Sequence, residues 1–176
     1  MRLRLTRKLI GAALLGSCLV AAPTWATEPA AGLSGSEQAS YLTELKRLYL
    51  TQSERQALLA HSNDLLKTYA LRAAYQVGQA QRQDLVYQLS LGAPGELVLR
   101  EETRDPRSGD MAVHNQRINL YGVDPYIKYD CPLSGISCVL HNPADGGVLL
   151  TIVRDHQGAA ELAKALSFLI RNLQKG

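Results

Sequence analysis

Residues 85–91, LVYQLSL, mark the point at which the apolar pattern of the chain changes. Leucine or tyrosine occupies every second position of this stretch, which is the period of a strand with one buried face. Before it, apolar residues recur three or four positions apart, as they do on a helix. The change of period predicts an α+β fold, with an N-terminal helical segment followed by a sheet.

The N-terminal half carries three signals for helix starts. Ser34 and Glu37 have the spacing of a capping box, and Ser53 begins a second one. A further set of cap-forming residues at 62–64 precedes an apolar stripe over 66–77 with helical spacing. We therefore expect helices arranged as a hairpin or as a bent pair, with a break just before Ser53.

The C-terminal half alternates between strand patterns and turn-forming residues. Asp155 then provides a cap for a last helix, whose apolar residues from Leu162 to Leu173 form one face. This order predicts an antiparallel β-meander with the C-terminal helix packed on the sheet, in a single α+β domain over residues 36–176. Beyond 85–91, strands are expected at 97–103, 113–121, 126–129, 139–141 and 148–153, the last of them as a central strand.

Cys131 and Cys138 are expected to form a disulfide that closes a hairpin. Pro132 and Gly135 lie in the loop between them, where both favour a tight reversal. A bond that closes a loop of this length stabilises the fold by about 2.5 kcal/mol in the chain-entropy model. Redox-active pairs usually have two residues between the cysteines rather than six, and His141 alone supplies too few ligands for zinc. The pair is therefore interpreted as structural, and no metal site is predicted.

Residues 1–26 have the layout of an export signal peptide. Four basic residues precede an uncharged run of 14 residues, Leu9–Ala22, and the small-residue segment 23–26 follows. The run is shorter than the roughly 20 residues of a membrane-spanning helix, so we expect cleavage after Ala26 and a flexible tether over 27–35. Removal of the signal leaves 15 basic and 16 acidic residues, which changes the net charge from +3 to −1. Binding to nucleic acid is therefore not expected.

Cys18 offers a second interpretation of the same segment. Leu15-Gly16-Ser17-Cys18 resembles a bacterial lipobox, in which the cysteine is lipidated and becomes the mature N-terminus. The protein would then be a membrane-anchored lipoprotein, whereas cleavage after Ala26 would leave it periplasmic or secreted. Both alternatives send the chain to an oxidising compartment and leave Cys131 and Cys138 to pair with each other.

The sequence contains no motif for catalysis. It lacks the G-x-S-x-G and S-x-x-K patterns of nucleophilic hydrolases, and its four histidines form no H-x-x-x-H pair. We predict no catalytic residue, cofactor or metal ligand. The candidate binding residues are Tyr121, Tyr126 and Tyr129, which lie near Asp124 and Asp130 beside the cysteine hairpin. Tyrosines on a rigid hairpin can stack on sugar rings or anchor a protein partner.

These observations predict a small exported, non-enzymatic binding protein of the bacterial cell envelope. Its partner would be an envelope protein or a polysaccharide, and its only attachment to the membrane would be lipid on Cys18. One alternative is a hydrolase of envelope polymers, because two distant acids can meet in a fold, and the nearest candidate pairs are Glu101-Glu102 and Asp124/Asp130. Another is a periplasmic inhibitor of such a hydrolase, which would present the Cys131–Cys138 loop to the cleft of its partner.

Overall fold

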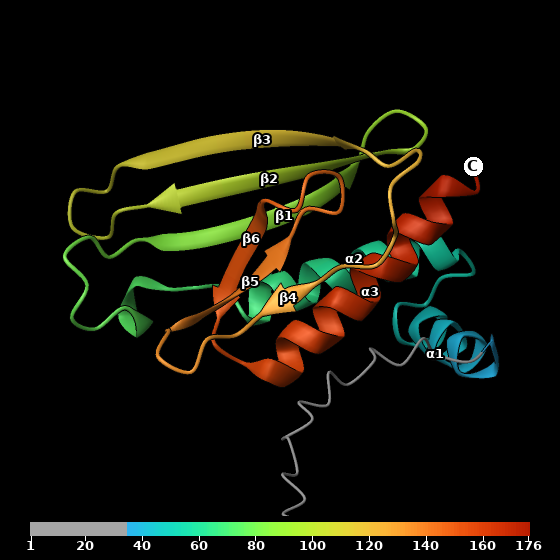
Figure 1. The fold of residues 1–176 in the computed structure, drawn as a ribbon, viewed down its shortest axis with the longest axis horizontal. Helices are drawn as coiled ribbons and strands as arrows, with labels where there is room; N and C mark the ends of the chain where they lie inside the picture. The colour runs from blue at the N-terminus through green and yellow to red at the C-terminus, as the bar shows by residue number, and fades with distance from the viewer. Residues whose placement is uncertain (1–34) are drawn as a thin grey trace, which may run out of the picture. The chain divides into compact units, whose positions relative to one another are not determined.

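The computed structural model of the protein describes residues 35–176. The expected signal peptide over 1–26 and the lipidation candidate Cys18 lie outside these residues. So does the expected tether, except for its last residue, Gly35, which begins the first helix. The elements follow in the order α1 (Gly35–Leu48), α2 (Glu54–Thr68), the short 3-10 helix η1 (Ala73–Tyr75), β1 (Asp84–Leu91), β2 (Glu96–Arg104), β3 (Met111–Asn119), β4 (Tyr129–Asp130), β5 (Ser137–His141), β6 (Val148–Val153) and α3 (His156–Gln174) (Figure 1).

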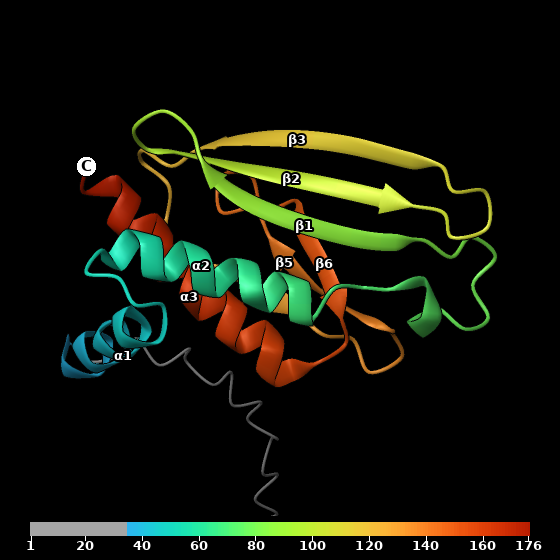
Figure 2. The same ribbon diagram turned by 180° about the vertical axis from the view of Figure 1, so that it is seen from behind.

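The α+β fold class predicted from the sequence is confirmed. In the described part of the chain, the strands form two antiparallel three-stranded sheets, with the orders β1-β2-β3 and β4-β5-β6. Figures 1 and 2 show α2 and α3 side by side below the β1-β2-β3 sheet, with α1 on the outside of this pair. α2 contacts β1, and α3 contacts β4 and β5, so each helix supports a different sheet.

The β1-β2-β3 sheet buries one face, as the alternating pattern predicts. Leu89 on β1 pairs with Leu99 on β2, and both side chains are buried. Tyr87 faces the same way, and its hydroxyl accepts a hydrogen bond of 3.3 Å from the Thr151 N–H on β6. The two sheets therefore share one core and are also joined by a polar contact.

The expectation that residues 148–153 form a central strand is wrong. This segment is β6, which lies at one end of the order β4-β5-β6, while β5 is central. Leu149, Leu150 and Ile152 are nevertheless buried in the core, and the chain after α2 runs along the other edge of the strand. Ala70 forms a bridge with Ile152, and the Tyr69 carbonyl accepts a hydrogen bond of 2.9 Å from the Val153 N–H. An apolar run thus indicates that the side chains of a strand are buried. It does not indicate whether the strand is central or at the end of its sheet.

The predicted third helix start at 62–64 is also wrong, since these residues lie in the interior of α2. The Asn63 side chain accepts a hydrogen bond of 2.8 Å from the Leu89 N–H and donates one of 3.0 Å to the Leu89 carbonyl. Its polar groups bind β1 and do not cap a helix. The helix also ends well before the apolar stripe does, and Leu71 instead forms a bridge with Leu85 at the start of β1.

Two predicted helix caps are confirmed. The Ser53 hydroxyl accepts a hydrogen bond of 3.3 Å from the Gln56 N–H at the start of α2. Asp155 accepts one of 2.7 Å from the Gly158 N–H at the start of α3. The expected apolar face of α3 is buried in the core, where it carries Leu162, Leu166, Leu169, Ile170 and Leu173. None of the described helices is long and apolar enough to cross a membrane.

Candidate functional site

The predicted Cys131–Cys138 disulfide is confirmed, with the two Cα atoms 4.2 Å apart. It joins the residue after β4 to β5 and closes a loop with a tight turn at its tip. In this turn the Gly135 N–H donates a hydrogen bond of 3.2 Å to the Pro132 carbonyl. Cys138 is fully buried, so the base of the hairpin is held both by the bond and by the core.

Two of the three candidate tyrosines line one shallow depression of about 530 Å³ beside this hairpin. Tyr126 is 44% exposed there, whereas Tyr129 packs partly against the core. A tyrosine held in this way presents a ring to a ligand without first losing much conformational freedom. We call this surface the tyrosine depression, and it is lined by Tyr126, Lys128, Tyr129, Asp130, His141 and Gly146.

Tyr121 lies apart from the tyrosine depression. Its ring packs against the turn between β1 and β2, where a Cβ atom added to Gly95 would lie 2.3 Å from it. Gly95 also has a φ angle of 73°, which favours glycine. Tyr121 is 55% exposed at this turn. The structure therefore brings Tyr126 and Tyr129 together and places Tyr121 elsewhere.

The backbone that carries these tyrosines is attached to α3. Gln174 Nε2 donates hydrogen bonds to the carbonyls of Leu120 (2.7 Å) and Val123 (2.9 Å). The Ile127 N–H donates one of 2.9 Å to Ser167 Oγ, and the Ile127 side chain is buried. The Ile127 N–H is thus bonded to a side chain and not to another strand, and the strand expected at 126–129 is present only as the two-residue β4.

His141 and Asp130 form the polar end of the tyrosine depression. His141 Nε2 lies 2.7 Å from Asp130 Oδ2, and His141 Nδ1 lies 3.2 Å from the Gly146 carbonyl oxygen. Both ring nitrogens therefore face oxygen acceptors, and neither is directed at a nucleophile. Asp124 accepts a hydrogen bond of 3.0 Å from the Tyr126 N–H, which fixes a turn. The His141–Asp130 pair is thus a polar contact at one end of the tyrosine depression.

A second polar cluster, for which the sequence contains no motif, joins the three helices. Glu161 Oε1 on α3 accepts a hydrogen bond of 2.7 Å from the Tyr41 hydroxyl on α1 and lies 3.2 Å from His61 Nε2 on α2. The Lys164 amine contacts the other oxygen of the same carboxylate. His61 Nδ1 lies 3.2 Å from the Tyr49 hydroxyl. We call these five residues the helix-junction cluster.

The helix-junction cluster shifts the ionisation of its members. Burial alone would raise the pKa of Glu161, but hydrogen bonds from His61 and its other two partners outweigh this effect and lower the pKa to about 2. Burial, together with the bond to Glu161, raises the pKa of the Tyr41 hydroxyl far above its usual value. Burial and a hydrogen bond to Asp64 raise the pKa of Tyr49 to about 12. At neutral pH Glu161 is therefore a carboxylate, and both tyrosines are neutral donors.

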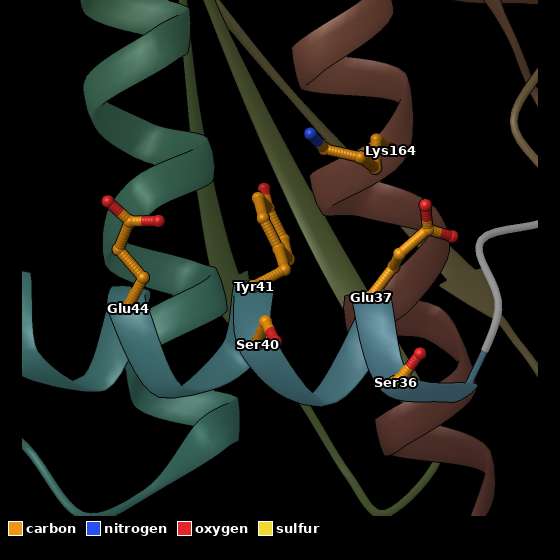
Figure 3. Close-up of a pocket in the computed structure, with 6 residues that line it drawn as sticks. All are labelled: Ser36, Glu37, Ser40, Tyr41, Glu44 and Lys164. Atoms are coloured by element: carbon orange, nitrogen blue, oxygen red, sulfur yellow. The ribbon is translucent and has the colours of Figure 1, made fainter.

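A shallow pocket of about 380 Å³ opens beside this cluster, lined by residues of α1 and by Lys164 of α3. Figure 3 shows Tyr41 rising from α1 between α2 and α3, with the Lys164 amine directed toward it. The Lys164 Nζ lies 4.3 Å from the centre of the Tyr41 ring. Because the Lys164 amine and Tyr41 are already engaged with each other and with Glu161, we interpret this region as the junction that holds α1.

The tyrosine depression is therefore the candidate functional site. It combines an exposed ring, a backbone fixed by a helix and a disulfide, and polar groups at one end. Among the described residues, no group of three or more His, Cys, Asp and Glu side chains is placed to hold a metal ion. Comparisons with protein families, curated proteins and solved structures gave no significant match to this chain.

Proposed function

We propose that this protein is a small exported, non-enzymatic binding protein of the bacterial cell envelope, and that it binds a polysaccharide in the tyrosine depression. The observation that carries the proposal is that Tyr126 and Tyr129 share one shallow surface with Asp130 and His141. Sugar rings have apolar C–H faces that pack on aromatic rings, and hydroxyls that need hydrogen-bond partners. Tyr126 supplies the aromatic surface, and Asp130 and Lys128 supply the polar partners.

The form of the site supports binding of a polymer. Pockets for small molecules bury most of the surface of their ligand, whereas this depression is shallow and open. An extended chain of sugars can cross such a surface and leave it at both ends. The two engaged nitrogens of His141 support a role in binding rather than in hydrolysis.

The disulfide supports the export part of the proposal. Bonds of this kind persist in oxidising compartments such as the bacterial periplasm and are rare in the cytosol. We infer that residues 1–26 direct export, and that the protein is then periplasmic or secreted after cleavage at Ala26. Attachment to the membrane through lipid on Cys18 is the alternative.

Co-sedimentation with insoluble peptidoglycan sacculi, and titration with a purified soluble O-polysaccharide, test this proposal. Tyr126→Ala is expected to weaken binding to the glycan by about tenfold, which corresponds to roughly 1.4 kcal/mol for one lost ring contact. Tyr75→Ala is the matched control, because Tyr75 is a similarly exposed tyrosine (57%) outside the depression. Absence of binding to both glycans, or an equal loss in the two variants, would overturn the proposal.

One observation favours the inhibitor alternative. Leu133, on the disulfide-closed loop, is 87% exposed, and a rigid loop with an apolar tip suits insertion into a cleft. The probe is a muramidase that cleaves peptidoglycan, assayed with and without the protein. Inhibition that is lost in Leu133→Asp but kept in Tyr126→Ala would favour the inhibitor function over glycan binding.

A further inference from the structure

β3 is the outer strand of the β1-β2-β3 sheet, and no described residue pairs with its second edge. Figures 1 and 2 both show it at the rim of the sheet, on the side away from the helices. Of its nine residues only Ile118 is buried. A strand edge of this length is a template for another strand, because its backbone N–H and C=O groups can form a further ladder.

The register shows which residues direct their backbone groups to the free edge. The Leu120 N–H donates a hydrogen bond of 2.9 Å to the Gly95 carbonyl, on the side of β2. In an antiparallel strand the N–H and C=O of one residue point to the same side, and that side alternates along the chain. The even-numbered residues of β3 therefore bond to β2, and Val113, Asn115 and Arg117 face outward.

The edge of β3 carries few of the features with which proteins usually prevent strand addition. It contains neither proline nor lysine, Arg117 is its only residue with a permanent charge, and its register with β2 runs without a bulge. Met111 and Val113 are 54% and 43% exposed beside this edge. The one charge on this edge is already engaged on β2, because Arg117 Nη1 lies 3.3 Å from Glu96 Oε2. This edge is therefore open to a partner strand.

We propose that β3 pairs with β3 of a second copy of this chain, antiparallel and about a two-fold axis at Asn115, so that two sheets become one of six strands. In this register Asn115 lies opposite Asn115 of the other copy, and Val113 lies opposite Arg117 of the other copy. The apolar stem of Arg117 can then cover the exposed Val113 side chain.

The choice of a second copy as the partner follows from the self-complementary pattern of the strand. With the axis at Asn115 all nine residues pair, and no two like charges lie opposite each other. Every other register shortens the ladder, and an axis at Arg117 also brings two guanidinium groups together. A strand pair alone buries less than the roughly 800 Å² per partner of a standard interface, so we expect a weak dimer. This self-association does not depend on the function proposed for the tyrosine depression.

Sedimentation velocity of the exported full-length product tests the proposal. The protein is expected to change from monomer to dimer as its concentration rises from about 1 µM to about 500 µM. Asn115→Pro is expected to remove the dimer, because it deletes an outward N–H that the monomer does not use. Asn115→Ala keeps this N–H and is expected to keep the dimer. A monomer at all concentrations, or a dimer in a folded Asn115→Pro variant, would overturn the proposal.

Cysteine cross-linking tests the register and does not depend on the folding of the proline variant. Asn115→Cys alone is expected to form a disulfide-linked dimer. Val113→Cys and Arg117→Cys are each expected to remain uncross-linked alone and to cross-link when mixed. Ser90→Cys, at an exposed position on β1, is the control for random thiol oxidation. Cross-linking of Asn115→Cys no faster than that of Ser90→Cys, or no reaction between the mixed variants, would contradict the proposed pairing.

Discussion

The Tyr41 hydroxyl donates a hydrogen bond of 2.7 Å to Glu161 Oε1, which joins the first described helix to the last one across 120 residues of sequence. The same carboxylate oxygen lies 3.2 Å from His61 Nε2, so a single side chain connects α1, α2 and α3. α1 contributes only Leu42 and Leu45 to the buried core. The polar bond is therefore an important part of what attaches this helix to the rest of the domain.

Tyr41→Phe is expected to destabilise the fold by about 1–2 kcal/mol, because it removes a hydrogen bond to a charged acceptor and keeps the ring. Urea unfolding measures this change as a lower midpoint at an unchanged slope. Tyr75→Phe is the control, since Tyr75 is an exposed residue of η1 outside the cluster. Equal midpoints for Tyr41→Phe and the unmodified protein would show that the bond does not stabilise the fold.

Stability is expected to fall in acid because of Glu161. Its pKa is lowered from 4.5 to about 2 in the folded protein, so the unfolded state binds its proton first as the pH decreases. The stabilisation is thus complete above about pH 4.5 and is lost as the pH falls toward 2. Urea unfolding across this range measures the loss. Glu161→Gln is expected to be less stable at pH 7 and to show a smaller dependence on pH, and an unchanged dependence would contradict this assignment.

Gly158→Ala is expected to destabilise the protein by about 1–2 kcal/mol through overpacking. A Cβ atom at Gly158 would lie 2.5 Å from the ring of Tyr69, so the ring would have to move away from the first turn of α3. Gly35→Ala is the matched control at a helical glycine, because no atom lies within 4 Å of a Cβ added there. Thermal unfolding of both variants measures the difference, and a Gly158→Ala variant as stable as Gly35→Ala would show that Tyr69 moves at little cost.

Replacement of both Cys131 and Cys138 by alanine is expected to cost about 2.5 kcal/mol, through the added freedom of the unfolded chain. Because this bond fixes the hairpin beside the tyrosine depression, affinity for the glycan is also expected to decrease. Urea unfolding and co-sedimentation with sacculi measure the two effects. Cys131→Ala alone is expected to give the same loss, since one cysteine cannot form the bond. Unchanged stability in the double variant would mean that the bond does not constrain the unfolded chain.

Intact-mass spectrometry of the exported protein is expected to show a mature chain that begins at Thr27 and does not react with an alkylating agent before reduction. Cleavage after Ala26 gives this mass, whereas lipidation of Cys18 gives a longer chain with added acyl groups. After reduction, alkylation is expected at Cys131 and Cys138 alone. An acylated product would identify a lipoprotein, and alkylation without reduction would show that the disulfide does not form in that compartment.

Much of the fold is visible in local sequence patterns. Ser53 and Asp155 mark helix starts, because a cap forms with a backbone N–H only three residues away. The alternation over 85–91 predicts a strand for a similar reason, since each side chain lies on one face or the other. Cap-like residues at 62–64 gave a wrong prediction because Asn63 hydrogen-bonds to Leu89, which is distant in the sequence.

The tyrosine depression was predictable only in part. Proximity in the chain suggested Tyr121, Tyr126 and Tyr129 as one group, and the structure brings only the last two together. The separation of Tyr121 follows from its contact with Gly95, and the position of His141 beside Asp130 follows from the β4–β5 pairing. Neither contact can be predicted from the residues that lie near it in the sequence.

Caps, alternation, turns and the spacing of the cysteines act over about ten residues, so the amino-acid sequence alone is enough to predict the α+β class and the disulfide. The export signal is also a local pattern of the sequence, and it remains a prediction. Three features cannot be predicted in this way: the contact between Tyr41 and Glu161, the edge position of β6 and the composition of the tyrosine depression. They depend on how distant elements pack against one another, because burial and hydrogen bonding between such elements are settled only when the whole core forms.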